Sequence, residues 1–338
     1  MKMLTRIRDR KLRDAISRTG VASPTELRTL TLKRAGVRTL QGIEQFRNLR
    51  KLDLSGNRIR EISPLARLHE LSGLFLCDNE IRELSALKNL SHLPALDISG
   101  NKLTGLDGLS GMRSLTWLNA SQNQIASAET LRHCAMLSNL NLRNNLIASA
   151  EALHELRLLR SLDLSQNELT GTITIPSTRQ SLRRLLLSRN AITDVTMDQD
   201  VCRVVELDVS GNLMASLDFI RAMPELVVAN LSENLFKEIT PIQACTKVRI
   251  LYLWMSGLES VRGLEKLTNL EELGLADNAI GDASSLLGLN RLKLLYLGTN
   301  YDIPTEAIWK LSLQVEEDFR GPDWRARVPG SPVRNDTE

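Results

Sequence analysis

Aromatic residues are scarce in this sequence of 338 residues: Phe, Trp and Tyr make up 4%, although 42% of the residues are hydrophobic. A core of this composition must be built from Leu, Ile, Val and Ala. The sequence also has no apolar run near the roughly 20 residues that a helix needs to cross a membrane. The segment from Met1 to Ser17 is charged throughout and does not resemble a secretory signal. These absences predict a protein without a membrane span.

A charge excess and catalytic motifs are also missing. Lys and Arg total 43 against 40 Asp and Glu, a net charge of +3, which is too small to indicate nucleic acid as a partner. The histidines are dispersed, and the sequence shows no Ser-His-Asp or Cys-His arrangement, glycine-rich phosphate loop or metal-ligand spacing. We therefore expect no enzyme activity, no metal, no cofactor and no small-molecule site.

A leucine pattern with a fixed period runs through most of the chain. One copy reads Leu49-x-x-Leu52-x-Leu54-x-x-Asn57-x-Ile59, and the same spacing recurs along the chain. Thirteen copies begin at residues 27, 49, 71, 93, 115, 137, 159, 182, 204, 226, 248, 270 and 292. Every step is 22 residues except that from 159 to 182, which is 23. A fixed period predicts a stack of repeats instead of several ordinary domains.

This pattern resembles that of leucine-rich-repeat proteins. Its period is similar to that of the subclass typified by a regulatory subunit of protein phosphatase 1, and to that of bacterial internalin repeats. The resemblance covers about residues 27–300. It implies a curved, horseshoe-shaped solenoid with a concave parallel sheet and helical or 3-10 returns on the convex side. For the phosphatase-regulator class, it implies that aromatic and acidic concave residues bind a phosphatase catalytic subunit.

The physical chemistry of the repeat supports the same fold. The Leu-x-Leu alternation suits a short strand with one buried face, the Asn amide can pair with backbone groups at the turn, and apolar residues spaced by three suit a short helical or 3-10 return. We predict an α/β fold with about thirteen strands, one per copy. A helical N-terminal cap (1–26), the repeats (27–303), a C-terminal cap (304–320) and a flexible tail (321–338) are expected. An Arg-rich targeting segment is the alternative for the first residues.

The outward-facing positions of the sheet indicate where a partner could bind. The third, fifth and seventh residues of each repeat should point away from the core, and most are small or polar. The repeat that starts at Val248 instead offers Ile250, Tyr252 and Trp254, and with its neighbours it forms the predicted apolar patch of Val228, Ile250, Tyr252, Trp254, Leu294 and Tyr296. We expect Gly274 and Ala276 to leave a trough between the aromatic residues. Exposed Tyr and Trp are typical of protein interfaces.

Other outward residues complete the candidate site. Phe75 and Trp117 form a smaller aromatic pair, and Glu206 and Asp208 form a charged patch with Arg184. The alternative for the apolar patch is that the C-terminal tail covers it with Phe319 or Trp324. We expect a partner protein or peptide, and no nucleic acid, because basic residues are dispersed among the outward positions.

Cysteine usage predicts the compartment. The four cysteines form neither a CxxC pair nor the terminal disulfide clusters of secreted leucine-rich-repeat proteins. The glycosylation sequons that begin at Asn119 and Asn230 lie within expected strands, where a glycan would obstruct the sheet face. We therefore expect a cytoplasmic protein, with a nuclear or cytoskeletal location as alternatives.

The function that follows is a non-catalytic intracellular scaffold, of which a phosphatase-regulatory subunit is one version. The alternatives are a substrate-recognition module of an enzyme complex, of the ubiquitin-transfer or effector type, and an axonemal or cytoskeletal component.

Overall fold

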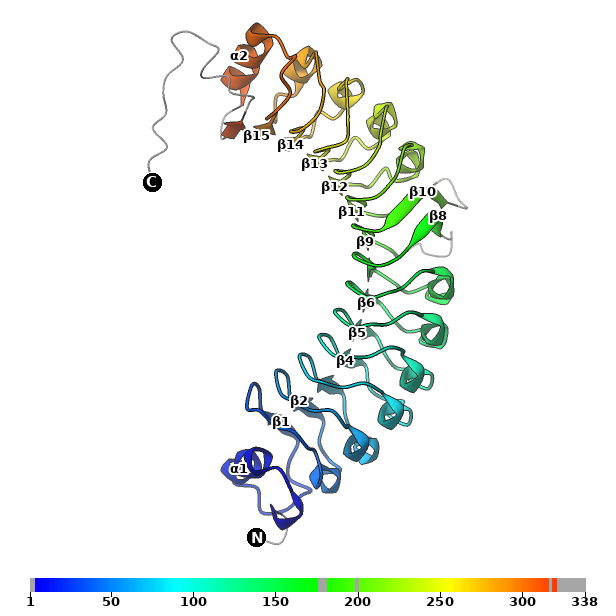
Figure 1. Cartoon of the computed structure of the whole chain (residues 1–338), viewed down its shortest axis with the longest axis vertical. Coiled ribbons are helices and arrows are strands. Elements are labelled where there is room, and N and C mark those ends of the chain that lie inside the picture. The colour runs from blue at the N-terminus through cyan, green and yellow to red at the C-terminus, as the bar shows by residue number, and fades with distance from the viewer. Residues whose placement is uncertain (1–3, 176–180, 198–200, 316–317, 321–338) are drawn as a thin grey trace. The chain divides into compact units, whose positions relative to one another are not determined.

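The computed structural model describes residues 4–175, 181–197, 201–315 and 318–320, and of the last three only the backbone. The chain forms two compact units, Met1–Leu169 and Thr170–Glu338. In each unit, short parallel strands follow one another along the inner side of the stack, and most return segments are short 3-10 helices on the outer side (Figure 1). The predicted α/β solenoid with one short strand per repeat is confirmed.

The first unit places the repeat leucines in register. Leu30, Leu52 and Leu74 are direct partners on successive parallel strands and are almost fully buried. The strands are β1 (Thr29–Thr31), β2 (Lys51–Asp53), β3 (Gly73–Phe75), β4 (Ala95–Asp97), β5 (Trp117–Asn119), β6 (Asn139–Asn141) and β7 (Ser161–Asp163). The 3-10 helices are η1 (Leu4–Arg6), η2 (Ile43–Gln45), η3 (Ser63–Arg67), η4 (Ser85–Leu87), η5 (Asp107–Leu109), η6 (Glu129–His133) and η7 (Glu151–Glu155).

The second unit continues the pattern. Its inner strands are β9 (Arg184–Leu186), β11 (Glu206–Asp208), β12 (Val228–Asn230), β13 (Ile250–Tyr252), β14 (Glu272–Gly274) and β15 (Leu294–Tyr296). Its 3-10 helices are η8 (Asp218–Ala222), η9 (Thr240–Ala244), η10 (Leu264–Lys266) and η11 (Ser284–Gly288). A further strand, β16 (Asp318–Arg320), pairs in parallel with β15.

The irregular repeats differ from the others on the outer side. There β8 (Thr170–Ile175) and β10 (Ala191–Met197) form a separate two-stranded parallel sheet where other repeats have 3-10 helices (Figure 1). Both segments are rich in Thr, Ile and Val, whose branched side chains favour extended backbone. The extra residue of this region therefore accompanies a change of secondary structure.

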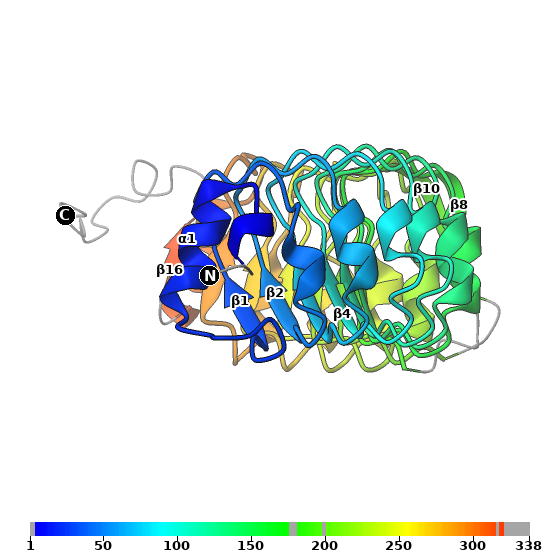
Figure 2. The ribbon, with the colours of Figure 1, turned by 90° about the horizontal axis from the view of Figure 1, so that it is seen from below.

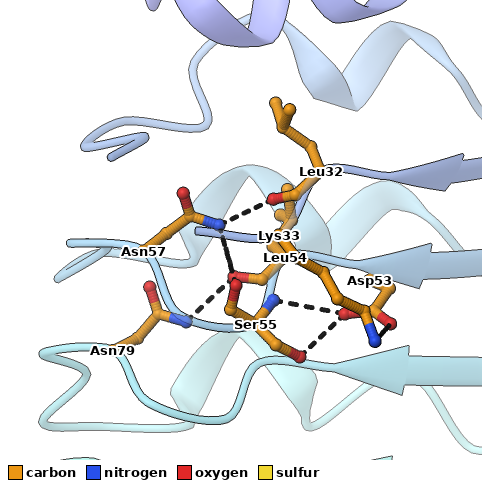
Figure 3. Close-up of polar contacts among 7 residues, drawn as sticks. All are labelled: Leu32, Lys33, Asp53, Leu54, Ser55, Asn57 and Asn79. Carbon is orange, nitrogen blue, oxygen red and sulfur yellow. Dashed lines mark hydrogen bonds and ion pairs between the residues drawn. The ribbon is translucent and has the colours of Figure 1, made fainter. Parts of the chain in front are cut away.

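A ladder of asparagines joins successive repeats. The Asn57 amide nitrogen donates to the Leu32 carbonyl (2.8 Å) and the Leu54 carbonyl (2.7 Å), and its Oδ1 accepts from the Val37 amide (2.9 Å). Asn79, one repeat later, donates to the same Leu54 carbonyl at 3.1 Å (Figure 3). Each asparagine thus satisfies backbone groups of its own repeat and of the preceding one, which explains the residue type at this position.

Helical segments lie beside the first and last repeats. In helix α1 (Arg10–Arg18), Leu12 and Ile16 are buried, and the Asp9 carboxylate caps the helix by accepting from the Lys11 and Leu12 amides. Figure 2 shows α1 next to β1. Helix α2 (Thr305–Gln314) buries Ile308 and Leu311. The predicted tail, 321–338, lies outside the described residues. Among the helices that are described, none is long and apolar enough to cross a membrane.

Candidate functional site

The parallel register arranges the predicted patch in rows across four strands of the second unit. Val228, Ile250, Glu272 and Leu294 are successive partners and form one row. Asn230, Tyr252, Gly274 and Tyr296 form the next row. Because side chains two residues apart point to the same face, the apolar residues predicted from the sequence lie together on β12, β13 and β15, with Trp254 just beyond β13.

Three rings form an aromatic cluster of Tyr252, Trp254 and Tyr296. The centroids of Tyr252 and Trp254 are 5.1 Å apart with planes tilted by 55°, and those of Trp254 and Tyr296 are 6.2 Å apart and nearly perpendicular, at 79°. Both arrangements are within the range in which aromatic pairs attract. Trp254 is 40% exposed, while both tyrosines are half-buried. The cluster is therefore held in place by its own contacts and still presents an indole to solvent.

The expected trough beside Gly274 is filled. A Cβ added at Gly274 would overlap the Trp254 indole, with Cε2 at 2.6 Å and Cδ1 at 2.8 Å. The indole thus extends from β13 over the glycine of β14 to reach Tyr296 on β15. The rings form a continuous surface instead of two groups with a gap, because Trp254 is long enough to bridge a strand that carries no side chain at this row.

A carboxylate borders the aromatic cluster. The Tyr252 hydroxyl donates to Glu272 Oε1 at 2.6 Å. Burial raises the pKa of the Tyr252 phenol well above its usual range, and the bonded Glu272 carboxylate raises it further. The phenol therefore stays protonated at physiological pH and keeps donating to Glu272, which holds the carboxylate beside the rings.

Two features of this repeat were missed in reading the sequence. The asparagine of the ladder is replaced by Ser256, whose hydroxyl donates to the Trp254 carbonyl at 3.1 Å. An asparagine at this position would accept a hydrogen bond from the Phe236 amide through its Oδ1. With serine here, the Phe236 amide has no hydrogen-bond partner among the described residues. Next to Trp254, Met255 is 59% exposed and has a φ of 50°. The ladder asparagine is the ninth residue of a repeat, so the sequence itself shows that the repeat beginning at Val248 has a serine at this position.

The acidic residues on β11 adjoin the patch. Glu206 pairs with Val228, and Asp208 with Asn230, in the strand register. The Glu206 carboxylate accepts from Arg184 Nε at 2.8 Å, and Asp208 Oδ1 accepts from the Ser210 hydroxyl at 2.6 Å. The predicted charged patch is present, but its Glu206 charge is balanced by Arg184.

Phe75 and Trp117, in the first unit, do not form a ring pair within the described structure. Phe75 shares a row with Asp97 and Asn119, whereas Trp117 shares a row with Gly73 and Ala95. Lys51 Nζ instead lies 5.6 Å from the centroid of the Phe75 ring. Phe75 is on β3 and Trp117 is on β5, with β4 between them, and the two residues belong to different rows. The rings are therefore not direct neighbours on the sheet.

A polar group of the first unit shows how an outward carboxylate is fixed. Asp53 accepts from Lys33 Nζ at 2.9 Å and from the Ser55 amide (3.2 Å) and hydroxyl (2.7 Å) (Figure 3). Burial by itself raises the pKa of Asp53, but the hydrogen bonds from Lys33 and Ser55 outweigh it and leave the pKa below its ordinary value. Asp53 is therefore an internal ion-pair partner.

The described part of the chain offers no metal centre, and the thiols of Cys134 and Cys245 are not activated. No group of three or more His, Cys, Asp or Glu side chains there could hold a metal ion. Burial raises the pKa of Cys134 to about 11 and that of Cys245 to about 12, so neither forms a thiolate nucleophile at neutral pH. Two cavities of about 520 and 500 Å³ lie on the outer returns of the first unit, lined by residues such as Arg67 and Lys88. The aromatic cluster is thus the feature that points most directly to recognition.

Comparisons with known proteins agree with this architecture. Models described as leucine-rich repeats match residues 48–68, 69–125, 158–178 and 266–284. No curated protein matches the sequence. The internalin inlF from Listeria monocytogenes has a similar structure, with a TM-score of 0.84 and 23% identity over 94% of this chain and 96% of that chain.

Two further solved structures are similar. The functional domain of InlJ from Listeria monocytogenes gives a TM-score of 0.75 and 21% identity over 89% of this chain and 74% of that chain. A chain of the LRIM1/APL1C complex gives a TM-score of 0.65 and 23% identity over 79% of this chain and 51% of that chain. At such identities the likeness concerns the fold alone. Together with the repeat matches and the asparagine ladder, it shows that the chain is a leucine-rich-repeat protein.

Proposed function

We propose that this protein is a non-catalytic scaffold that binds a partner protein on the strand face of its second unit, centred on the aromatic cluster. The exposed indole of Trp254 is the observation that carries the proposal. It keeps 40% of its surface in solvent although two tyrosines pack against it. A partly buried, pre-positioned Trp loses little conformational entropy on binding and can bury a large apolar area.

The surrounding surface fits such an interface. The half-buried side chains of Val228, Ile250 and Leu294 lie in one row beside the rings, and Glu272 lies within this row between Ile250 and Leu294. Apolar side chains combined with a few polar groups that hydrogen-bond across the contact are typical of protein–protein interfaces. The similar LRIM1/APL1C structure is that of a complex. Phe75 and Trp117 belong to the first unit and do not pack together, so they are not part of the proposed interface.

A phosphatase-regulatory role is one version of this scaffold, and its support is the combination of aromatic and acidic residues around Tyr252 and Asp208. A substrate-recognition module of an enzyme complex would use the same face. An intracellular location accompanies the proposal. It is supported by the free thiols of Cys77, Cys134 and Cys245, and by the position of the Asn230 sequon on β12.

Affinity purification from cells that make the protein tests the proposal. The tagged full chain, Trp254→Ala and Trp117→Ala are compared, because both variants remove a tryptophan from an outward strand position. We expect one or more proteins to be retained by the wild type and by Trp117→Ala and to be lost with Trp254→Ala, while circular dichroism of the variants is unchanged. Equal recovery of all partners with Trp254→Ala would reject the aromatic cluster as the binding site.

A further inference from the structure

On strands β12 to β15, the face around the aromatic cluster carries charge of one sign. The next strand, β16, adds one acidic residue and one basic residue, Asp318 and Arg320, which pair with Leu294 and Tyr296 in the strand register. In the four repeats that span residues 226–300, the third, fifth, seventh and eighth positions include Glu233, Glu272 and Asp277 and no Lys or Arg. Glu233 and Asp277 are exposed and Glu272 is half-buried. Basic residues of these repeats lie at other positions, and two of them are neutralised: Lys247 pairs with Glu225 at 2.7 Å and Arg249 with Glu271 at 2.8 Å.

The aromatic cluster also has unused hydrogen-bonding groups. The Trp254 indole N–H has no partner in the described structure. Glu272 receives the Tyr252 hydroxyl on Oε1, and its Oε2 has no hydrogen-bond or ion-pair partner among the described residues. The Trp254 indole is 40% exposed, so its ring and the Glu272 Oε2 atom are both available on neighbouring strands, and the Tyr252 hydrogen bond orients the carboxylate.

We infer that this face binds a basic segment of the partner protein and that an arginine of this segment stacks on Trp254 while its guanidinium reaches Glu272. This inference rests on the proposed function and names the chemistry of its partner. A guanidinium is planar, stays charged, stacks on aromatic rings and pairs with carboxylates. Attraction between a cation and an indole face adds to the charge–charge attraction when the site is partly desolvated.

The acidic charge on this face disfavours three other kinds of binding partner: an acidic segment, an RNA strand and a purely apolar segment. An acidic segment or an RNA strand would bring phosphate or carboxylate groups next to Glu233, Glu272 and Asp277, where like charges repel. A purely apolar segment would desolvate Glu272 Oε2 without giving it a hydrogen-bond or ion-pair partner, which is costly. A basic segment satisfies the rings and the carboxylates together.

Fluorescence anisotropy with labelled peptides tests the inference on the full-length protein. Four glycine–serine peptides are compared that differ only in carrying arginine, citrulline, glutamate or leucine, together with a single-stranded RNA. Citrulline keeps the shape of arginine and removes its charge. We expect the arginine peptide to bind about tenfold more tightly than the citrulline peptide, and its binding to weaken as salt is added.

Variants assign the binding to the site. Trp254→Ala should weaken the arginine peptide about tenfold, and Glu272→Gln, which still accepts the Tyr252 hydroxyl, should weaken it about threefold or more. Trp117→Ala is the control and should bind like the wild type. Equal binding of the arginine and citrulline peptides, no binding of any peptide, tighter binding of RNA or glutamate peptide, or unchanged binding by Glu272→Gln would each overturn the inference.

The proposed function and the inference of a basic partner segment can be refuted independently of each other. If the leucine peptide binds best and Trp254→Ala abolishes that binding, the aromatic cluster is still a binding site and only the cationic partner is wrong. If affinity purification shows no dependence on Trp254, the proposed function fails whatever the peptides do.

Discussion

The indole of Trp254 lies across Gly274, which belongs to the neighbouring strand β14, and reaches Tyr296 beyond it. This contact depends on the missing side chain: any Cβ at residue 274 would occupy space that the indole fills. Gly274 therefore determines where Trp254 points, and with it the shape of the candidate interface.

Gly274→Ala tests this relationship. The added methyl group should push the indole away from the sheet, because the alternative is a severe overlap with the pyrrole ring. We expect acrylamide to quench the fluorescence of Trp254 more strongly in this variant. The Trp254 signal is obtained by subtracting the fluorescence of the same protein that also carries Trp254→Phe. Gly281→Ala is the matched control, since a Cβ at Gly281 meets nothing within 4 Å. Identical quenching in both variants would contradict the placement of the indole.

The 22-residue repeat pattern predicts which residues lie on the strand face around Trp254, but it does not predict how their side chains contact one another. Register followed from the 22-residue step, because Leu251 must pair with Leu273 if both are to be buried. The frame places Trp254 and Tyr296 two repeats apart, and nothing in it states that a glycine between them lets the rings touch. Side-chain torsions decide that contact, and a sequence pattern does not encode them.

The irregular region shows a similar limit. The 23-residue step before Leu182 located the disturbance, whereas the two outer strands depend on the alternation of Thr, Ile and Val in β8 and β10. That alternation is present in the sequence, but the 22-residue pattern by itself predicts the same helical or 3-10 return in every repeat.

Asn145→Ala tests the ladder in the first unit. The Asn145 amide donates to the carbonyls of Ala120 (3.0 Å) and Leu142 (2.9 Å), and its Oδ1 accepts from the Ile125 amide (3.0 Å). Because these groups are buried, alanine should lower the free energy of unfolding by about 1–3 kcal/mol, measured by urea denaturation. Asn139→Ala, at an exposed strand position, is the control and should change stability little. Equal midpoints for both variants would rule out a structural role for the ladder.

Acid should weaken the first unit through Asp53. Its folded-state pKa lies below the ordinary value of 3.8, so the ionised form stabilises the fold above that pH, and the contribution is lost as pH falls through the folded-state pKa. We expect the urea midpoint of Asp53→Asn to fall less between about pH 6 and about pH 3 than that of the wild type. Lys33→Met should reduce the pH dependence in the same direction, because it removes the strongest hydrogen bond that lowers this pKa. A wild-type slope retained in both variants would show that Asp53 does not contribute.

Two buried thiols should report unfolding. The thiol of Cys245 donates to the Ile220 carbonyl at 3.3 Å, and that of Cys134 to the Leu109 carbonyl at 3.6 Å. Their raised pKa values mean that the unfolded chain releases these protons first, so stability should decline above the ordinary thiol pKa of 9.0. At about pH 8, maleimide should label both residues only after urea is added. The half-buried Cys77 should react earlier, and labelling of Cys245 in the native protein as fast as Cys77 would contradict its burial.

The serine in the asparagine ladder has a mechanical consequence. Elsewhere in the second unit, side chains such as Asn212 and Asn234 bridge a repeat to the one before it, so neighbouring repeats separate only when those bonds break. At Ser256 this bridge is absent, and the Phe236 amide has no hydrogen-bond partner among the described residues. Coupling through an asparagine side chain is therefore missing at the boundary between the repeats that begin at residues 226 and 248, where the Trp254 amide instead donates to the Ser232 hydroxyl at 3.1 Å. Under a pulling force applied to the C-terminal end, these two repeats would separate without first breaking an asparagine bridge, directly beside the aromatic cluster.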